Sequence, residues 1–522
     1  MRNSCGSVLV VSLVVSLVVF GLSACGDDLP TTVQASVSRA VPTQPGGTFG
    51  GADVGAPADT TMGADAVPAD TATPPDSATP DVRPEDVVGP EDASGLDATT
   101  PDTLAPDTTL PDPIGGPTPY PADRVQSPIT PFVVQRLQAI AQRDPSLQDD
   151  VFMKVGASTT VSGSFLKCFA GNTVDFGAYP ALESTRDFFL SGTAGGTDPF
   201  SRTSLSAKSG VSARWAIDGD PPPLLIEYGA TAPRFAFIHY GTNDMGLGST
   251  YLSALYPFSE NLWTIIDTLL DLGVIPILAT IQRRLDRPAA DLWVSTYNNV
   301  IRAIAKGRQV PLVDMWLANE DLPRHGLASD GLHSASDPDG PCLFDAGGLQ
   351  YGMNNRNLQM LTVLSRLEAA ILDGETADPP APDSLAVGTV DDPISIDGLP
   401  FQDLRDTRVG PQAFFDRYPG CAATQNEEGP EFVYRLDLTR QTRLRATVHD
   451  LGTTDIDLHL LDGTGTPEGC IARHNGSIEA TLDAGTYYLV LDTFVSGAGL
   501  ERSGEYLLSL IECPAEDPTC GD

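Results

Sequence analysis

The fold class is decided by residues 234–280, RFAFIHYGTNDMGLGSTYLSALYPFSENLWTIIDTLLDLGVIPILAT. The stretch opens with an apolar run that ends at Gly241, which predicts a buried strand. The next part carries apolar residues at helical spacing and stops at Gly273, which predicts a helix. The run VIPILAT then predicts a second strand. Strand, helix and strand in this order form the repeating unit of a parallel α/β sheet.

The same alternation continues on both sides of this stretch. DVFMKVG (150–156) and VPLVDMW (310–316) predict strands, whereas ADLWVSTYNNVIRAIAKG (290–307) and residues 348–372 predict helices. We therefore expect one α/β domain over residues 121–375. In such a domain ligands bind at the carboxyl ends of the parallel strands.

The C-terminal part has a different texture. Residues 376–396 are rich in Pro and Asp and predict a linker. Residues 397–522 then carry short alternating segments between Gly and Asp turns, namely EFVYRLDL, RLRATVHD, DIDLHLLD, SIEATLD, GTYYLVLD and GEYLLSLI. This spacing predicts an all-β sandwich. The stretch AGTYYLVLD (484–492) resembles the pre-peptidase C-terminal domains of secreted bacterial enzymes.

The N-terminus indicates export. Arg2 precedes an apolar run, Val8–Leu22, that is shorter than the roughly 20 residues of a membrane span. The run ends in Leu-Ser-Ala-Cys at Cys25, which resembles the bacterial lipobox. The resemblance implies a signal peptide at residues 1–24 and lipidation of Cys25, so we expect a lipoprotein of the cell envelope facing the periplasm or the cell surface. A plain secretory peptide or an uncleaved anchor is the alternative.

Composition limits the partners of the exported chain. Residues 25–120 consist largely of Pro, Thr, Asp, Ala and Gly, which predicts a disordered tether between the membrane and the folded part. The net charge of −38 argues against nucleic acid and against anionic lipid heads as partners. No motif for a metal or a cofactor stands out, so we expect none.

The cysteines agree with an oxidising compartment. Besides Cys5 and Cys25 the chain holds an even set: Cys168, Cys342, Cys421, Cys470, Cys513 and Cys520. An even number of cysteines in an exported protein indicates disulfides. Pairing within each domain gives 168–342, 421–470 and 513–520, although the sequence leaves the connectivity open.

Three short blocks, each after a strand or near a strand end, carry the candidate chemistry. Ser158 in Gly-Ala-Ser follows the first strand, where its hydroxyl can reach the rim of the sheet. Asn243 in Gly-Thr-Asn-Asp follows the second strand and can donate to an oxyanion without titrating. Asp330 and His333 are three residues apart, so the carboxylate can orient the imidazole as a base. Taken singly, each block also fits a helix cap, a turn or a surface loop.

Together the blocks resemble the SGNH (GDSL-type) hydrolase superfamily. The resemblance implies a flavodoxin-like, three-layer α/β domain with Ser158 as nucleophile, His333 as general base and acid, and Asp330 as its partner. The Ser158 N–H, the Asn243 amide and a glycine N–H would form the oxyanion hole. Gly210 is the best candidate for that glycine, with Gly195 and Gly196 as rivals.

One position departs from the family pattern, because Ala157 stands where Gly-Asp-Ser has aspartate. The resemblance predicts an esterase acting on O-acetyl glycans or short-chain acyl esters through a Ser158-acyl intermediate. The alternative, favoured by Ala157 alone, is a weak or inactive cell-surface binding lipoprotein. The oligomeric state stays open.

The remaining titratable residues of interest have ordinary interpretations. His239 lies in an apolar strand and is expected in the core. His449, His459 and His474 fall in the β domain and are expected at its surface. Asp455 and Asp457 could ligate calcium, but alternating acidic residues on a strand usually face solvent.

Overall fold

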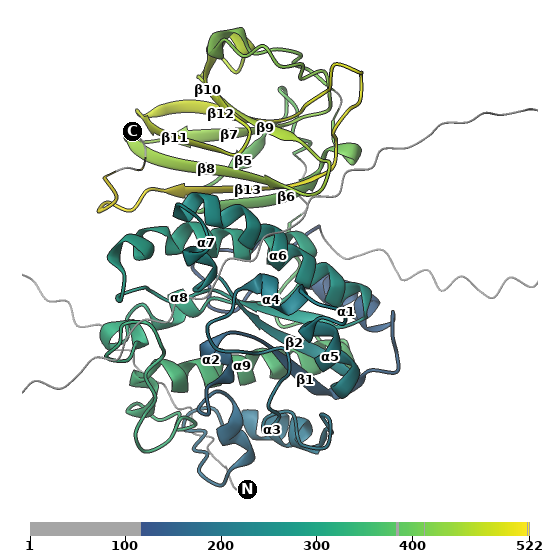
Figure 1. Ribbon diagram of the computed structural model, residues 1–522, viewed down its shortest axis with the longest axis vertical. Helices are drawn as coiled ribbons and strands as arrows, with labels where there is room; N and C mark the ends of the chain where they lie inside the picture. The colour runs from purple at the N-terminus through teal and green to yellow at the C-terminus, as the bar shows by residue number, and fades with distance from the viewer. Residues whose placement is uncertain (1–115, 383–385, 412, 519, 521–522) are drawn as a thin grey trace, which may run out of the picture. The chain divides into compact units, whose positions relative to one another are not determined.

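The computed structural model describes residues 116–522, apart from 383–385, 412, 519 and 521–522 (Figure 1). Cys25, the predicted signal peptide and nearly all of the predicted tether lie outside the described residues. Within the described part, no helix is long and apolar enough to cross a membrane.

The first domain is built on a parallel sheet. Its strands stand in the order β1-β2-β3-β4, and every neighbouring pair is parallel. Their bounds are β1 Gln148–Gly156, β2 Pro233–His239, β3 Ile275–Ala279 and β4 Leu312–Val313. At the outer edge of β1, Gly156 donates to Ser206 and accepts from Lys208, which adds a single parallel bridge at Ala207. The predicted α/β class with a parallel sheet is confirmed.

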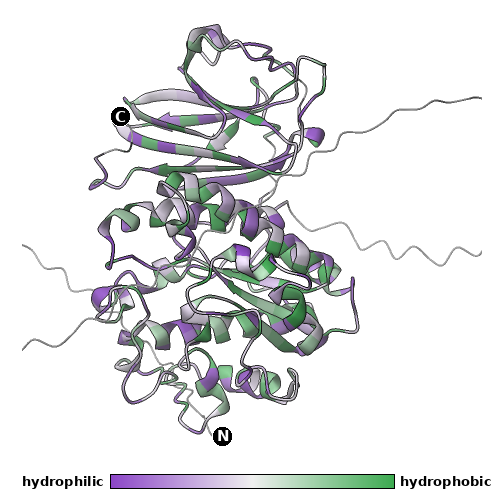
Figure 2. Cartoon of the chain, viewed as in Figure 1, coloured by the Kyte–Doolittle hydropathy of each residue, from purple (hydrophilic) through white to green (hydrophobic). Residues whose placement is uncertain are grey.

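Helices cover both faces of this sheet (Figure 1). Helices α4 to α7 lie on one face, and α3 and α9 lie on the other, with α1 against Ala369–Asp373, the turn that follows α9. Their bounds are α1 Pro131–Ala141, α2 Ser158–Val161, α3 Leu182–Ser191, α4 Ala213–Ile217, α5 Pro223–Thr231, α6 Tyr251–Asp271, α7 Pro288–Arg308, α8 Met315–Asn319 and α9 Gly352–Glu368. Because both faces are covered, β2 and β3 are buried along their whole length, and the central strands are hydrophobic (Figure 2).

Local signals set the ends of these helices. Thr250 and Ser253 form a reciprocal capping box at the start of α6, and Pro288 occupies the first turn of α7. The strand predicted through Trp316 ends early, because the side chain of Asp314 accepts from the Leu317 N–H and caps α8. The predicted strand was therefore too long because the apolar run contains an aspartate that caps the next helix.

The second domain is a β-sandwich. One sheet has the order β10-β9-β12-β7-β5 and the other has the order β11-β8-β13-β6. The bounds are β5 Ile394–Ile396, β6 Phe401–Asp406, β7 Phe432–Leu438, β8 Thr442–Asp450, β9 Ile456–Leu461, β10 Cys470–His474, β11 Ser477–Leu482, β12 Gly485–Thr493 and β13 Glu505–Glu512. Strand β5 lies inside the segment expected to be a linker. The domain boundaries stay predictions.

Two histidines of this domain are buried, so the expectation that they lie at the surface is wrong. The ring of His449 on β8 lies 4.9 Å from the ring of Tyr256, which belongs to α6, and the two rings are tilted by 41°. His459 on β9 is stacked at 3.5 Å from Tyr418 in the loop before β7. Outward positions of a sandwich face solvent only when nothing covers the sheet, and here a helix and a loop cover them. His474 is exposed as expected.

Asp457 is buried as well, contrary to the expectation of a solvent-facing strand position. Its carboxylate pairs with Arg473, and it lies opposite Asp492 on β12. Across the described part of the chain, His, Cys, Asp and Glu side chains form no group of three placed to hold a metal ion.

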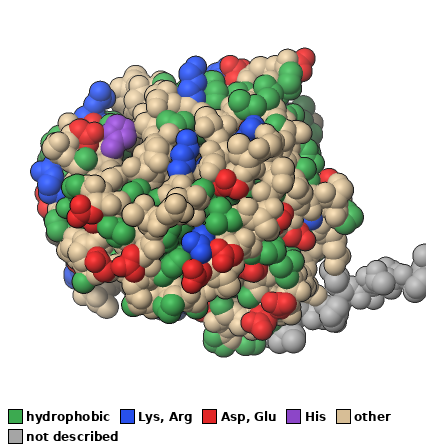
Figure 3. Space-filling view, turned by 90° about the horizontal axis from the view of Figure 1, so that it is seen from below, with side chains coloured by type: hydrophobic (Ala, Val, Ile, Leu, Met, Phe, Trp, Pro, Cys, Tyr) green, Lys and Arg blue, Asp and Glu red, His purple; other side chains and the backbone are tan. Residues whose placement is uncertain are grey.

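The predicted disulfides are confirmed. Cys168 is bonded to Cys342, Cys421 to Cys470, and Cys513 to Cys520. The first bond ties the segment after α2 to the loop before α9, and the second fixes the loop that covers β9 and β12. Elsewhere on the surface, acidic and basic side chains are interspersed, as one face of the molecule illustrates (Figure 3).

Two of the three disulfides close loops of very different length, which predicts unlike effects on stability. Residues 168 and 342 are 174 apart, whereas 513 and 520 are 7 apart. Loop-closure entropy then gives about 5 kcal/mol of stabilisation for the first bond and about 2 kcal/mol for the second. Urea unfolding of the paired Cys→Ser variants should show the larger loss for Cys168–Cys342. Equal losses would contradict this account.

Candidate active site

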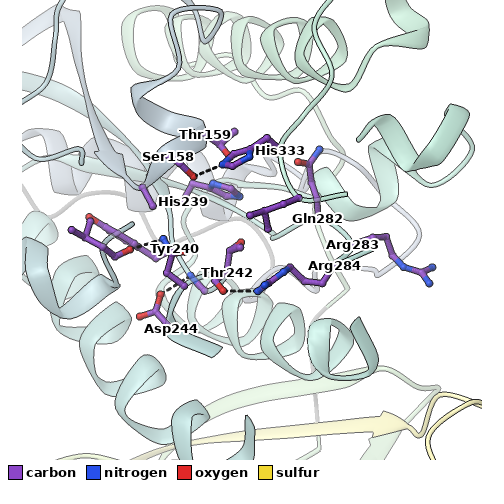
Figure 4. A pocket seen from close by; sticks show the side chains of 15 residues that line it. Ser158, Thr159, His239, Tyr240, Thr242, Asp244, Gln282, Arg283, Arg284 and His333 are labelled. Carbon is purple, nitrogen blue, oxygen red and sulfur yellow. Dashed lines mark hydrogen bonds between the residues drawn. The ribbon is translucent and has the colours of Figure 1, made fainter. Parts of the chain in front are cut away.

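The first and third sequence blocks meet at the carboxyl end of the sheet (Figure 4). Ser158 is the first residue of α2, two residues after the last residue of β1, and His333 lies in the loop between α8 and α9. The Ser158 Oγ and the His333 Nε2 are 2.9 Å apart, and the His333 Nδ1 and the Asp330 Oδ2 are 2.7 Å apart. When a hydroxyl, an imidazole and a carboxylate are hydrogen-bonded in this order, the serine can pass its proton to the histidine.

Asp330 is held as a carboxylate by its own loop. Its Oδ1 accepts from the backbone N–H groups of Leu332 at 3.0 Å and His333 at 3.1 Å. Partial burial acts to raise the pKa of Asp330, but these bonds and the one from the His333 ring outweigh it and lower the pKa to about 2. A carboxylate at the Nδ1 side places the ring proton there, so the Nε2 lone pair can accept from Ser158.

The second block lies on the opposite wall of the same pocket. The Asn243 Nδ2 donates to the Val211 carbonyl at 2.9 Å, which uses one of the two amide hydrogens and leaves the other for a ligand. Asn243, Val211 and Ser158 all line the pocket. The arrangement can stabilise negative charge on an oxygen placed between Ser158 and Asn243.

Asp244 joins the two segments of this wall. Its Oδ1 accepts from the Ala213 N–H at 2.9 Å, and its Oδ2 accepts from the Gly241 N–H at 3.0 Å. Gly241 has φ of +123°, a backbone conformation that glycine adopts without strain. Burial raises the pKa of Asp244 to about 6, against the opposing effect of these amide donors.

The glycine candidates are less clearly placed. Gly210 has φ of +78°, and the residue after it, Val211, lines the pocket. Gly195 and Gly196 lie in the turn closed by the bridge between Ala194 and Thr197. None of the three glycines is among the residues that line the pocket, so an N–H donor from the Gly210 segment stays a prediction.

The nucleophile turn is built without the family aspartate. Ala157 is nearly buried and lines the pocket, and its carbonyl accepts from the Thr160 and Val161 N–H groups, which closes α2. The residue before it, Gly156, is fixed through both of its backbone groups, because its N–H donates to Ser206 and its carbonyl accepts from Lys208. Backbone hydrogen bonds thus hold the turn at a position where a side-chain carboxylate is missing.

Several pocket residues carried no signal in the sequence. The wall also contains His239, Gln282, Arg283, Arg284 and Leu332. His239 is buried as predicted, and its Nδ1 lies 3.4 Å from Arg356. Gln282, Arg283 and Arg284 follow β3, and only the rule that ligand sites lie beyond strand ends could have pointed to them.

A parallel sheet with serine, histidine and aspartate joined beyond its strand ends is the arrangement of a serine hydrolase. Residues 189–335 match the model of the GDSL-like lipase/acylhydrolase family, which supports a hydrolase of this type. The matched range contains Asn243, Asp330 and His333, and it begins after Ser158.

Solved structures resemble each domain separately. A GDSL-like lipase from Bacteroides thetaiotaomicron is 13% identical and covers 45% of this chain and 99% of its own, with a TM-score of 0.28. An acetylxylan esterase mutant from Geobacillus stearothermophilus is 15% identical over 41% of this chain and 93% of its own, with a TM-score of 0.27. The pre-peptidase C-terminal domain of a Bacillus anthracis collagenase is 15% identical over 22% and 92%, with a TM-score of 0.16. No curated protein matches.

The raised pKa of Asp244 predicts that the free energy of unfolding depends on pH. Its pKa of about 6 in the folded protein lies above the unfolded value of 3.8. The stabilisation of the folded protein by the protonated carboxyl is therefore complete below pH 4 and is lost as the pH rises through 6. A shift of this size corresponds to about 3 kcal/mol. Urea unfolding at pH 4, 5 and 6 should show this loss in the wild type relative to Asp244→Asn. A parallel pH dependence of the two proteins would contradict it.

Proposed function

We propose that this protein is a serine esterase that hydrolyses acetyl or other short-chain acyl esters, with Ser158 as its nucleophile. The observation that supports the proposal most strongly is the 2.9 Å contact between the Ser158 Oγ and the His333 Nε2, with Asp330 on the far side of the ring. The GDSL-like hydrolase domain gives the same reaction class.

The proposed reaction has two steps. In the first, Ser158 attacks the ester carbonyl while His333 takes its proton, and the oxyanion receives hydrogen bonds from the Ser158 N–H and the Asn243 amide. The tetrahedral species expels the alcohol, which leaves with the proton from His333. In the second step, His333 removes a proton from water, the hydroxide adds to the acyl carbonyl, and Ser158 leaves with the proton as the acid is released.

The pocket wall favours a short acyl group. Each buried methylene of an acyl chain gains about 0.8 kcal/mol from an apolar wall. The aliphatic side chains among the lining residues are Ala157, Val211 and Leu332, together with the methyl groups of Thr159 and Thr242, and most of the rest are polar or charged. Such a wall offers little to a long chain and suits an acetyl group. The acetylxylan esterase similarity agrees with a glycan-borne acetyl ester as substrate.

We also propose that the enzyme acts at the cell envelope. The sequence around Cys25 fits lipidation, and the three disulfides fit an oxidising compartment. A lipid anchor and the Pro-rich segment that follows it would hold the catalytic domain near exogenous or cell-wall esters.

The catalytic proposal is tested by one substitution with a matched control. Ser158→Ala should lower the rate of p-nitrophenyl acetate hydrolysis by a factor of about 10³ or more, because the acyl acceptor is lost. Ser162→Ala, at the end of the same helix and outside the pocket wall, should retain activity. The wild type should prefer the acetate over the octanoate ester. Equal rates for wild type and Ser158→Ala would overturn the proposal.

Anchoring is tested separately by fractionation. In a bacterial host that lipidates exported proteins, the wild-type chain should sediment with membranes and be released by detergent. Cys25→Ser should move to the soluble fraction. If both forms distribute alike, the anchor proposal fails while the esterase proposal stands.

A further inference from the structure

The loop after β3, residues 282–286, contributes three side chains to the pocket wall without any role in the proton relay. Two of them are neighbouring arginines that point in different directions (Figure 4). Arg283 points away from the nucleophile, whereas Arg284 reaches toward the loop that follows β2. The contacts of Arg284 separate it from an ordinary surface cation.

Arg284 uses its guanidinium at both ends. Its Nη1 donates to the carbonyl of Thr242 at 2.8 Å, directly before Asn243 in the chain. Its Nε and Nη2 donate to the two carboxylate oxygens of Asp286 at 2.8 and 2.9 Å. A bidentate pair of this kind fixes the plane of the guanidinium, so the position of Thr242 is tied to the position of Asp286.

Asp286 in turn contacts the loop of the catalytic base. Its backbone N–H donates to the Gly331 carbonyl at 3.1 Å, between Asp330 and His333. Gly331 has φ of +70°, and a Cβ added there would lie 2.9 Å from the Asp286 nitrogen. The two backbones therefore pack too closely for any other residue at this position.

A second contact holds the other side of the same loop. The Ser334 Oγ donates to the Gln282 Oε1 at 2.8 Å, and both side chains are buried. The 282–286 loop thus holds the residues on both sides of His333. Through Arg284 it also holds the residue before Asn243.

The charge of Arg284 is balanced by the carboxylate of Asp286 in the same loop. Arg284 is 6% exposed, and its hydrogen bonds are the largest cause of the lowered pKa of Asp286. A neutralised, nearly buried guanidinium is poorly suited to bind an anionic substrate. Its geometry suits a rigid link between two backbones. We call the Arg284–Asp286 pair the strut, because it connects the carbonyl of Thr242 to the carbonyl of Gly331.

We infer that Arg284 is a positioning residue, which with Asp286 fixes the distance between the oxyanion wall at Asn243 and the base at His333. The inference rests on the proposed function, since it assigns Arg284 to the same reaction. A relaxed strut would leave substrate binding nearly intact but misalign the base and the oxyanion donor, which act together in the transition state.

The kinetic test compares Arg284 with an arginine outside the pocket wall. Arg284→Met in the full chain should lower kcat for p-nitrophenyl acetate at least about tenfold and change KM less than about threefold. Arg186→Met is the matched control, because Arg186 lies on α3, pairs with Glu183 and Asp187, and is outside the pocket wall. It should stay within about threefold of wild type in both constants.

A double variant tests whether the strut is a unit. Asp286→Asn should lower kcat as well, and Arg284→Met with Asp286→Asn should cost no more than the worse single change. Additive losses, or a loss confined to KM, would overturn the inference in favour of separate local effects.

A readout without catalysis separates this inference from the proposed function. In hydrogen–deuterium exchange, the peptide spanning residues 327–336 should exchange faster in Arg284→Met than in wild type or in Arg186→Met. Unchanged exchange would overturn the inference even if the enzyme is active. Faster exchange in a protein whose wild type hydrolyses no ester would support the strut and reject the proposed function.

Discussion

The hydrogen bond between Ser158 and His333 is the contact on which the rest of the catalytic domain depends. Its partners are 175 residues apart in the chain and 2.9 Å apart in space. Neither side chain is held there by local structure alone, because α2 has four residues and His333 lies in a loop. The sheet supplies the common edge at which they meet, and the loops beyond the strands supply the fine adjustment.

Those loops are fixed mostly by polar contacts to backbone. Asp244 joins the ends of two segments through two amide donors, Asp330 binds the amides of its own turn, and the bridge at Gly156 steadies the nucleophile. Carboxylates that accept from backbone N–H groups set direction as well as energy. The site therefore tolerates Ala157, because the turn that presents Ser158 is closed by main-chain bonds.

The second domain is packed against the first over α7. Asn299 donates to the carbonyl of Phe401 at 2.7 Å and to Ser509 at 2.8 Å, and the Arg445 guanidinium lies 3.6 Å from the Trp293 ring centroid. Buried polar contacts of this kind are made at a fixed geometry. They explain why outward positions of β8, such as His449, are buried here.

Much of the fold follows from the spacing of apolar residues in the sequence and from the glycines that end each segment. The strand–helix–strand pattern around Gly241 and Gly273 predicts the sheet, and the even cysteine set predicts the disulfides that are observed. Burial on the outer faces of the sandwich could not be predicted, since alternation describes one strand and not what covers it. The role of Arg284 was equally hidden, because it depends on three backbones that meet only in the folded chain.

Covalent trapping of the nucleophile tests the central claim most directly. An activated serine beside a histidine base reacts with an alkyl fluorophosphonate, whereas ordinary serines do not. Peptide mass spectrometry of the treated full chain should place one phosphonyl group on Ser158 and none in Ser158→Ala. A wild-type protein that stays unmodified, or is modified at another serine, would contradict the account.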